Sequence, residues 1–226
     1  MLSTRTMPKI FSQFDQIRVI NLASRPDRRK QMIQQIRALH LDEHPSIEFF
    51  DAISRSDPGP FLKVGSHGAF DSHFEVLRMA ASQGHSVLIL QDDCKFIRAV
   101  EDAVDISQVD IFYGGWQALD EGALENSDIV GAHCMGFSSN AAAKAAEYLS
   151  GYKRPEFSPD PRAAAAADYN PSVRPPIDGA LVWFRRANPK LVVKFHKISE
   201  QRSSVSSISP KTFSLRALVK RVVGQI

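Results

Sequence analysis

The chain has 226 residues, which suits one domain with its own hydrophobic core, or a domain followed by a short tail. Apolar residues make up 43% and charged residues 23%, ordinary values for a globular protein, so the composition excludes a largely disordered chain. The net charge of +3 comes from 28 basic and 25 acidic residues, a balance too even to favour nucleic acid as a partner.

Cysteine usage and hydropathy indicate the compartment. Cys94 and Cys134 are too few for a disulfide framework and lack the spacing of a metal knuckle, which favours a reducing compartment. The first 20 residues contain no continuous apolar segment typical of a signal peptide, and no stretch approaches the roughly 20 apolar residues of a membrane span. We therefore expect a cytoplasmic protein, with peripheral attachment at the inner membrane as a further expectation.

The first half of the chain alternates segments typical of strands with segments typical of helices. Ser24 is the expected N-cap of the first helix, with Pro26 in its first turn, and Gly84 is expected to end the second helix. Glycines and prolines predict a loop before that second helix. The predicted order is a strand at 17–22, a helix at 27–41, a strand at 47–53, a loop at 54–68 and a helix at 69–83.

The second half continues the alternation. The predicted order is a buried strand at 86–90, strands at 109–113 and 133–137, a helix at 140–151 ended by Gly151, a surface loop at 152–176 and a strand at 177–184. This pattern predicts an α/β domain over 1–210, with a sheet sandwiched between helices. Ligands of such sheets bind beyond the carboxyl ends of the strands, where the chain places its most informative polar clusters.

The strongest chemical signal is Leu-Ile-Leu-Gln-Asp-Asp, in which an apolar strand ends at Asp92 and Asp93. Hard cations such as Mg²⁺ or Mn²⁺ prefer oxygen ligands, and substrate phosphates often complete their coordination shell. Such a cation would neutralise a leaving diphosphate. The alternative is that both aspartates only cap the next turn. The motif by itself also fits phosphatases and nucleotide-binding folds, so it indicates metal and phosphate chemistry without naming a reaction.

Five segments between residue 17 and about residue 209 resemble, in order, the motifs of glycosyltransferase family 25, the lipooligosaccharide and collagen galactosyltransferase group. The segments are VINLASRPDRR, GSHGAFDSHFEVLR, LILQDDCKF, PIDGALVWF and the Ser-rich QRSSVSSIS. The resemblance implies a GT-A-like nucleotide-binding fold and transfer of a sugar, often galactose from UDP-galactose, with inversion. It also implies a divalent cation, Mn²⁺ or Mg²⁺, and a saccharide or lipid-linked acceptor in bacterial surface glycolipid synthesis. The missing secretory signal favours the bacterial branch over the collagen branch.

The chain departs from this family at one position. The acidic segment of the family usually reads Glu-Asp-Asp, whereas this chain has Gln91 at the first position. A neutral amide there would weaken a metal site and leave Asp93 as the main ligand. The departure leaves open a second hypothesis, a non-catalytic nucleotide-sugar or glycan-binding protein on the same fold.

The resemblance assigns roles to individual residues. It implies donor binding by Asn21, Arg28, Ser72, His73 and Asp92, metal binding by Asp93, and catalysis by Asp178. A guanidinium suits phosphate oxygens, and a carboxylate beside a glycine suits a base that takes the proton of the acceptor hydroxyl. The alternatives are a solvated helix face for Arg28, a structural hydrogen bond for His73 and a turn aspartate at 178. The rival bases are Asp168, Asp120 and Glu121.

Two further features are open to more than one interpretation. Trp116 follows two glycines and could stack on a sugar or a nucleobase, although an aromatic at a strand end is often a core residue. The tail at 211–226 places valines and leucines on one side of a helix and basic residues on the other. Such a helix can lie on an anionic membrane surface, or it can pack against the domain.

Overall fold

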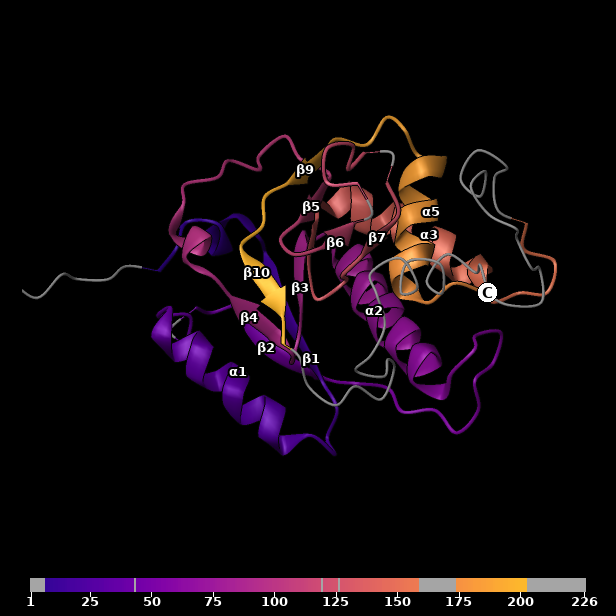
Figure 1. Cartoon of the computed structure of the whole chain (residues 1–226), viewed down its shortest axis with the longest axis horizontal. Helices are drawn as coiled ribbons and strands as arrows, with labels where there is room; N and C mark the ends of the chain where they lie inside the picture. The colour runs from indigo at the N-terminus through magenta and orange to yellow at the C-terminus, as the bar shows by residue number, and fades with distance from the viewer. Residues whose placement is uncertain (1–6, 43, 119, 126, 159–173, 203–226) are drawn as a thin grey trace, which may run out of the picture.

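A computed structural model describes residues 7–42, 44–118, 120–125, 127–158 and 174–202 (Figure 1). Its centre is a six-stranded mixed sheet, in which only β8 runs antiparallel to its neighbours. In spatial order the strands are β2 (Ile47–Asp51), β1 (Gln16–Asn21), β3 (Val87–Gln91), β8 (Cys134–Phe137), β5 (Ile111–Tyr113) and β9 (Val193–Phe195).

Helices cover both faces of the sheet (Figure 1). On one face lies α1 (Pro26–Ala38), and the other is covered by α2 (Val64–Gln83), α3 (Ser139–Tyr152) and α5 (Ile177–Ala187). Leu88 and Leu90 of β3 belong to the core beneath α1, while Val87 and Ile89 belong to the core beneath the other helices. A strand buried on both faces explains the unbroken apolar run. The predicted α/β class is confirmed, and the layers are consistent with a GT-A-like fold.

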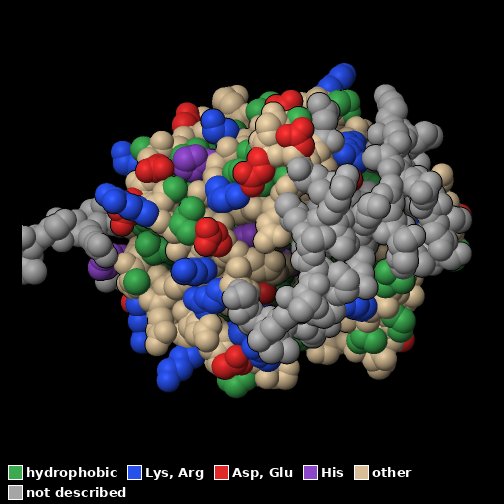
Figure 2. All heavy atoms as spheres, viewed as in Figure 1, with side chains coloured by type: hydrophobic (Ala, Val, Ile, Leu, Met, Phe, Trp, Pro, Cys, Tyr) green, Lys and Arg blue, Asp and Glu red, His purple; other side chains and the backbone are tan. Residues whose placement is uncertain are grey.

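Shorter elements join the strands. One antiparallel pair is formed by β4 (Cys94–Phe96) and β10 (Ser199–Gln201), and a second by β6 (Gln117–Ala118) and β7 (Ile129–Val130). The 3₁₀ helices are η1 (Phe11–Gln13) and η2 (Arg98–Glu101). No helix in the described part of the chain is long and apolar enough to cross a membrane. On the face drawn in Figure 2, acidic and basic side chains are interspersed, in line with the nearly even charge balance.

The predicted strand at 177–184 is wrong, because these residues form the first eight positions of α5. The helix is buried on nearly all sides: Gly179 and every residue from Ala180 to Arg185 are buried. A helix enclosed in this way carries no polar stripe, so its sequence is as uniformly apolar as that of a central strand. Hydrophobic periodicity alone therefore could not distinguish the two.

Three helix boundaries also differ from the predictions. The second helix begins at Val64 rather than at 69, because Gly68 is a packing residue: a Cβ there would lie 2.5 Å from the carbonyl oxygen of Ile53. Arg25, not Ser24, precedes the first residue of α1, and no side chain caps that helix. Gly151 lies inside α3, which continues for one more residue. The predicted helix at 211–226 lies outside the described residues.

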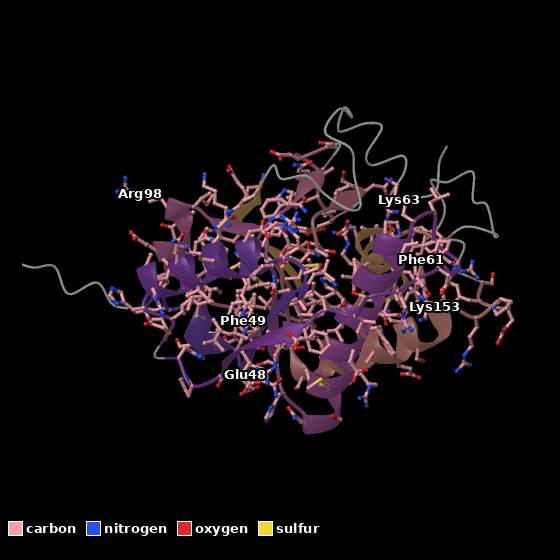
Figure 3. All side chains as sticks on the ribbon, turned by 90° about the horizontal axis from the view of Figure 1, so that it is seen from below. Glu48, Phe49, Phe61, Lys63, Arg98 and Lys153 are labelled. Carbon is pink, nitrogen blue, oxygen red and sulfur yellow. The ribbon has the colours of Figure 1, made fainter. Side chains whose placement is uncertain are left out.

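A charged cluster fixes α2 to α3 and to the loop after β2. The buried carboxylate of Asp71 accepts hydrogen bonds from Arg55 Nε at 2.6 Å and Lys153 Nζ at 2.6 Å, and His67 Nε2 lies 3.4 Å away. Lys153 Nζ also lies 5.9 Å from the ring centroid of Phe70. Figure 3 shows Lys153 beside Phe61 at this end of the molecule.

We expect Asp71→Asn to lower the free energy of unfolding by about 2 kcal/mol, because a hydrogen bond to a charged group contributes about 1.5–3 kcal/mol. Urea denaturation followed by circular dichroism measures the change. The control is Glu75→Gln on the same helix, whose ion pair with Arg78 lies at the surface and is expected to contribute far less to stability. Equal losses in the two variants would contradict a structural role for the Asp71 cluster.

Candidate functional site

The neighbouring parallel strands β1 and β3 bring the predicted polar residues to one edge of the sheet. Asn21 is the last residue of β1, and Asp92 and Asp93 form the turn that follows β3. The backbone N–H of Asp92 donates to the carbonyl of Ile20 at 3.1 Å, which continues the pairing of the two strands into the turn. The carboxyl ends of β1 and β3 therefore present these side chains together, as expected for an α/β sheet.

Asp92 is held by two partners. Its Oδ2 accepts from Asn21 Nδ2 at 2.7 Å, and its Oδ1 accepts from Arg28 Nη1 at 3.0 Å. The short loop between β1 and α1 places Arg28 in the first turns of the helix, directly over the strand ends. Asn21 and Asp92 are 2% and 6% exposed, so this is a nearly buried charged network. With both oxygens engaged, Asp92 orients Arg28 and Asn21.

Only one of the two carboxylate oxygens of Asp93 accepts a hydrogen bond from the described residues. Its Oδ2 accepts from Gln201 Nε2 at 3.2 Å and lies 3.5 Å from Arg28 Nη1, while its backbone carbonyl accepts from the N–H of Arg202 at 2.8 Å. Its Oδ1 is buried and makes no hydrogen bond with any described residue. Burial raises the pKa of Asp93, with Gln201 and Arg28 opposing that shift.

The donor set at Asp93 can be compared with the needs of a divalent cation. No group of three or more His, Cys, Asp or Glu side chains in the described ranges is arranged to hold a metal ion. Mg²⁺, however, is often held by one or two carboxylates together with substrate phosphates and water. Asp93 Oδ1, which is buried and accepts no hydrogen bond from a described residue, fits a cation of this kind. The remaining ligands of that cation would come from a phosphate-containing substrate.

Gln201 is a site residue that the sequence did not reveal. It ends β10, which pairs with β4 and so places residue 201 opposite Cys94, next to the acidic turn. β10 contains only three residues and its pairing spans about a hundred residues of chain, so no local periodicity marks it. The only available signal was its position at the start of the Ser-rich QRSSVSSIS segment.

Ser72 and His73 lie within α2, and their hydrogen bonds are made inside the protein. Ser72 Oγ donates to the carbonyl of Gly68 at 2.7 Å and accepts from the N–H of Ile53 at 2.9 Å. His73 Nδ1 lies 2.8 Å from the carbonyl of Ala69, and its Nε2 lies 3.3 Å from Gln91 Nε2. Burial lowers the pKa of His73, so the neutral ring donates from Nδ1 and accepts from the Gln91 amide. Their predicted contacts with a donor stay predictions.

Asp178 lies in the first turn of α5. Its Oδ1 accepts from the backbone N–H groups of Gly131, at 3.3 Å, and Ala132, at 2.6 Å. No described residue donates to its Oδ2. Burial raises the pKa of Asp178 to about 6; the two backbone donors oppose the shift and the charge of Asp93 adds to it. The charge of Asp93 therefore acts on Asp178 and disfavours its ionised form.

The tripeptide Gly131–His133 connects these parts, a role that no motif in the sequence indicates. The carbonyl of Ala132 lies 3.3 Å from His73 Nε2, and the carbonyl of His133 accepts from the N–H of Gln91 at 2.9 Å. Gly131 has φ of +130°, a conformation that favours glycine. The bond from Gln91 and the two N–H groups that reach Asp178 join α5 to the end of β3, while the Ala132 carbonyl contacts His73 of α2 without a hydrogen bond to its unprotonated Nε2.

The remaining predicted residues lie around this site. Trp116 follows β5 and is partly exposed. Asp120 lies in an exposed loop, where its Oδ1 accepts from the N–H of Gly122 at 2.8 Å. Glu121, in the same loop, pairs with Lys197 at 3.3 Å. Asp168 lies outside the described residues. The structure therefore brings together Asn21, Arg28, Asp92 and Asp93, and it connects Asp178 to the end of β3 through the backbone of residues 131–133.

Comparison with known proteins gives a partial match. The chain is 31% identical over 145 residues to a "Glycosyltransferase 25 family member" of Aedes aegypti, a match that covers 51% of this chain and 23% of the relative. It is 30% identical over 143 residues to a protein of the same description in Drosophila melanogaster, covering 50% and 23%. The chain thus spans about a quarter of the length of these relatives, and no protein-family model matches it. Over half of its length this chain is similar to glycosyltransferase 25 family members, which confirms the resemblance seen in its motifs.

Proposed function

We propose that this protein is a glycosyltransferase that moves a sugar from a nucleotide-sugar donor to a saccharide acceptor, assisted by a divalent cation. The observation that carries the proposal is the buried network at the end of β3, in which Arg28 and Asn21 hold Asp92 while Asp93 keeps an open oxygen. Arginine and a bound cation are the groups that proteins use to hold a diphosphate. The similarity to named glycosyltransferases selects this reaction among the phosphate chemistries.

Each residue of this network has a separate role in holding the nucleotide-sugar donor. Arg28 offers a guanidinium to the diphosphate, with its position set by Asp92, and Asn21 holds the other oxygen of that carboxylate. Asp93 Oδ1 would hold Mn²⁺ or Mg²⁺, and a cation bound there would supply positive charge to the leaving diphosphate. Gln201 fixes the second oxygen of Asp93, so the open oxygen keeps one orientation.

Asp178 takes the role of the base. In an inverting transfer the acceptor oxygen attacks the anomeric carbon opposite the leaving diphosphate, and its proton passes to a base. Asp178 Oδ1 is fixed by two backbone N–H groups, and Oδ2 makes no hydrogen bond within the described part of the chain. A pKa of about 6 leaves the carboxylate ionised at pH 7 and makes it more basic than an ordinary aspartate.

The finer assignment is galactose from UDP-galactose, transferred with inversion to an acceptor of bacterial surface glycolipid synthesis. The motif resemblance supports this assignment. Its test is a turnover screen with UDP-galactose, UDP-glucose and UDP-N-acetylglucosamine, with the anomeric configuration of the product read by NMR. Faster turnover with UDP-galactose and a β-linked product are expected. Retention of the α configuration would exclude Asp178 as the base of a single-displacement transfer.

A second candidate is a non-catalytic nucleotide-sugar or glycan-binding protein, which Gln91 favours. The Gln91 amide contacts His73, and because glutamine is uncharged, position 91 adds no third carboxylate to Asp92 and Asp93 as a ligand for a cation. Nucleotide-sugar binding without hydrolysis or transfer, in the presence of Mn²⁺ and a range of acceptors, would favour this candidate.

The proposed lipid-linked acceptor leads to a prediction for the tail. We expect deletion of residues 211–226 to reduce sedimentation with anionic liposomes and to leave the melting temperature of the domain unchanged. The reason is that a basic amphipathic helix gains both apolar burial and electrostatic attraction at an anionic surface. Neutral phosphatidylcholine liposomes serve as the control. Equal sedimentation of the full chain and the truncated chain with anionic liposomes would contradict the prediction.

A further inference from the structure

An aromatic cluster lies at the carboxyl ends of β5 and β9, apart from the acidic turn. The ring of Tyr113 stacks on that of Phe195 with centroids 4.9 Å apart, and the indole of Trp116 meets Phe195 edge-on at 5.7 Å. Tyr113 is buried, whereas Trp116 is partly exposed. Figure 1 shows β5, β6 and β9 gathered on this side of the molecule, and Trp116 is the residue that directly precedes β6 in the chain. The indole is therefore a supported aromatic surface with access to solvent.

A lysine covers this indole. Lys197 Nζ lies 4.8 Å from the centroid of the Trp116 ring and 3.3 Å from Glu121 Oε1. The side chains of Lys197 and Glu121 are 33% and 65% exposed. An exposed ion pair and an exposed cation–π contact each contribute little to stability. A small change in free energy is therefore enough to move the ammonium off the ring.

The indole lies next to the residue that holds the proposed base. A Cβ built on Gly131 would lie 3.0 Å from the Cα of Trp116, and the N–H of Gly131 donates to Asp178. The backbone of Trp116 therefore directly contacts the segment that fixes Asp178. The indole Nε1 is buried and has no hydrogen-bond partner among the residues that the structure describes.

The position of the cluster separates it from the diphosphate. The proposed donor groups lie at the ends of β1 and β3, whereas Trp116 follows β5, and β8 runs between β3 and β5. Two strand spacings amount to about 10 Å, on the order of the length of a disaccharide. A ligand on Trp116 would therefore lie on the acceptor side of Asp178, away from the nucleotide.

We propose that Trp116 and Lys197 form an acceptor subsite for a saccharide ring that carries a negative charge. The apolar face of the sugar stacks on the indole, and the Lys197 ammonium leaves Glu121 to pair with the carboxylate or phosphate of the sugar. A neutral sugar has no group that would draw Lys197 off the ring, so the lysine disfavours neutral ligands as well as attracting anionic ones. This inference rests on the proposed glycosyltransferase function.

Tryptophan fluorescence tests the subsite directly. The chain has two tryptophans, and Trp183 is fully buried, so a change in emission on ligand binding reports Trp116. The probes are a disaccharide ending in glucuronic acid and the neutral glucose disaccharide of the same linkage. Glucose 6-phosphate and glucose form a second pair that separates phosphate from carboxylate recognition. Titrations are made on the full chain with UDP and Mn²⁺ present.

We expect the acidic member of at least one pair to bind about 10-fold more tightly than the neutral one, as one charge-assisted hydrogen bond allows. Lys197→Gln should remove this preference, and Trp116→Phe should abolish the fluorescence change. The control is Lys190→Gln, an exposed lysine beyond the end of α5, which should keep the preference.

Three results would overturn the subsite: equal binding of the acidic and neutral saccharides, a preference that survives Lys197→Gln, or no emission change at millimolar saccharide. Thermal stabilisation of the wild-type protein by nucleotide sugars is measured on the same preparation. Donor binding together with one of these three results would reject the subsite alone. The absence of any donor binding would reject the proposed function itself.

Discussion

Replacing Asp178 by asparagine is expected to lower kcat for sugar transfer by about 10²- to 10⁴-fold, the usual contribution of a general base. Asparagine keeps an oxygen that can accept from the N–H groups of Gly131 and Ala132, so the fold and the donor site should be retained. Steady-state kinetics with a saturating donor measure kcat, and donor-induced thermal stabilisation checks binding. An equal loss in Asp120→Asn, the rival in the exposed loop, would move the role of the base to that loop.

The same residue predicts a pH dependence. Because the pKa of Asp178 is about 6 and the base must be ionised, kcat should fall as the pH drops below about 6. The residual activity of Asp178→Asn should lack this acidic limb. The effect of Asp178 on folding stability has the opposite pH dependence. A carboxyl whose pKa is raised in the folded state stabilises the fold at pH values below its unfolded pKa, near 4. This contribution is lost as the pH rises through the folded-state pKa of about 6. A wild-type limb near pH 4 would contradict the assignment.

Replacing Asp93 by asparagine is expected to lower turnover on the order of 10²-fold or more in the presence of Mn²⁺, because a cation supplies several kcal/mol of charge stabilisation in the transition state. The variant replaces an anionic oxygen that no described residue satisfies. Kinetics at several Mn²⁺ concentrations measure the effect. The control is Asp105→Asn, an exposed carboxylate that caps the N–H of Ser107 and should leave turnover unchanged.

The stability of this variant separates a functional role from a structural one. Burial raises the pKa of Asp93, so its ionised form is disfavoured in the folded protein without ligand. The neutral amide should therefore leave the melting temperature of the ligand-free protein equal or higher, the usual relation at sites kept for function. A drop of several degrees in the melting temperature corresponds, for a chain of this size, to a loss of about 2 kcal/mol or more in the free energy of unfolding. Such a drop would indicate that Asp93 stabilises the fold.

The elements that the sequence predicted are those whose pattern is local. The run from Val87 to Leu90 is apolar at every position because β3 is buried on both faces there, and Gln91 and the two acids follow at the carboxyl end of the strand. Met32 and Ile36 of α1 are buried at helical spacing while the opposite face is solvated. In such segments burial and periodicity carry the same information, so the strand ends and the residues gathered there could be predicted.

The elements that were missed depend on contacts distant in sequence. α5 was mistaken for a strand because its neighbours bury it on nearly every side, and Gly68 was mistaken for a loop residue because its packing partner lies beyond β2. The contact of Gln201 with Asp93 depends on the pairing of β10 with β4, and the role of Gly131 depends on the position of α5. None of these contacts changes the hydrophobic periodicity of the segment in which the residue lies, so that periodicity could not reveal them.

The most direct test of the central claim is a thermal-shift titration of wild type and Asp93→Asn with UDP, GDP and CMP sugars, with and without Mn²⁺. The proposed function predicts a rise in melting temperature with one donor, dependent on Mn²⁺ and lost in the variant. At a donor concentration of about 100 Kd the stabilisation should approach about 2.7 kcal/mol. No shift with any donor, or an equal shift in both proteins, would contradict a metal-assisted donor site at Asp93.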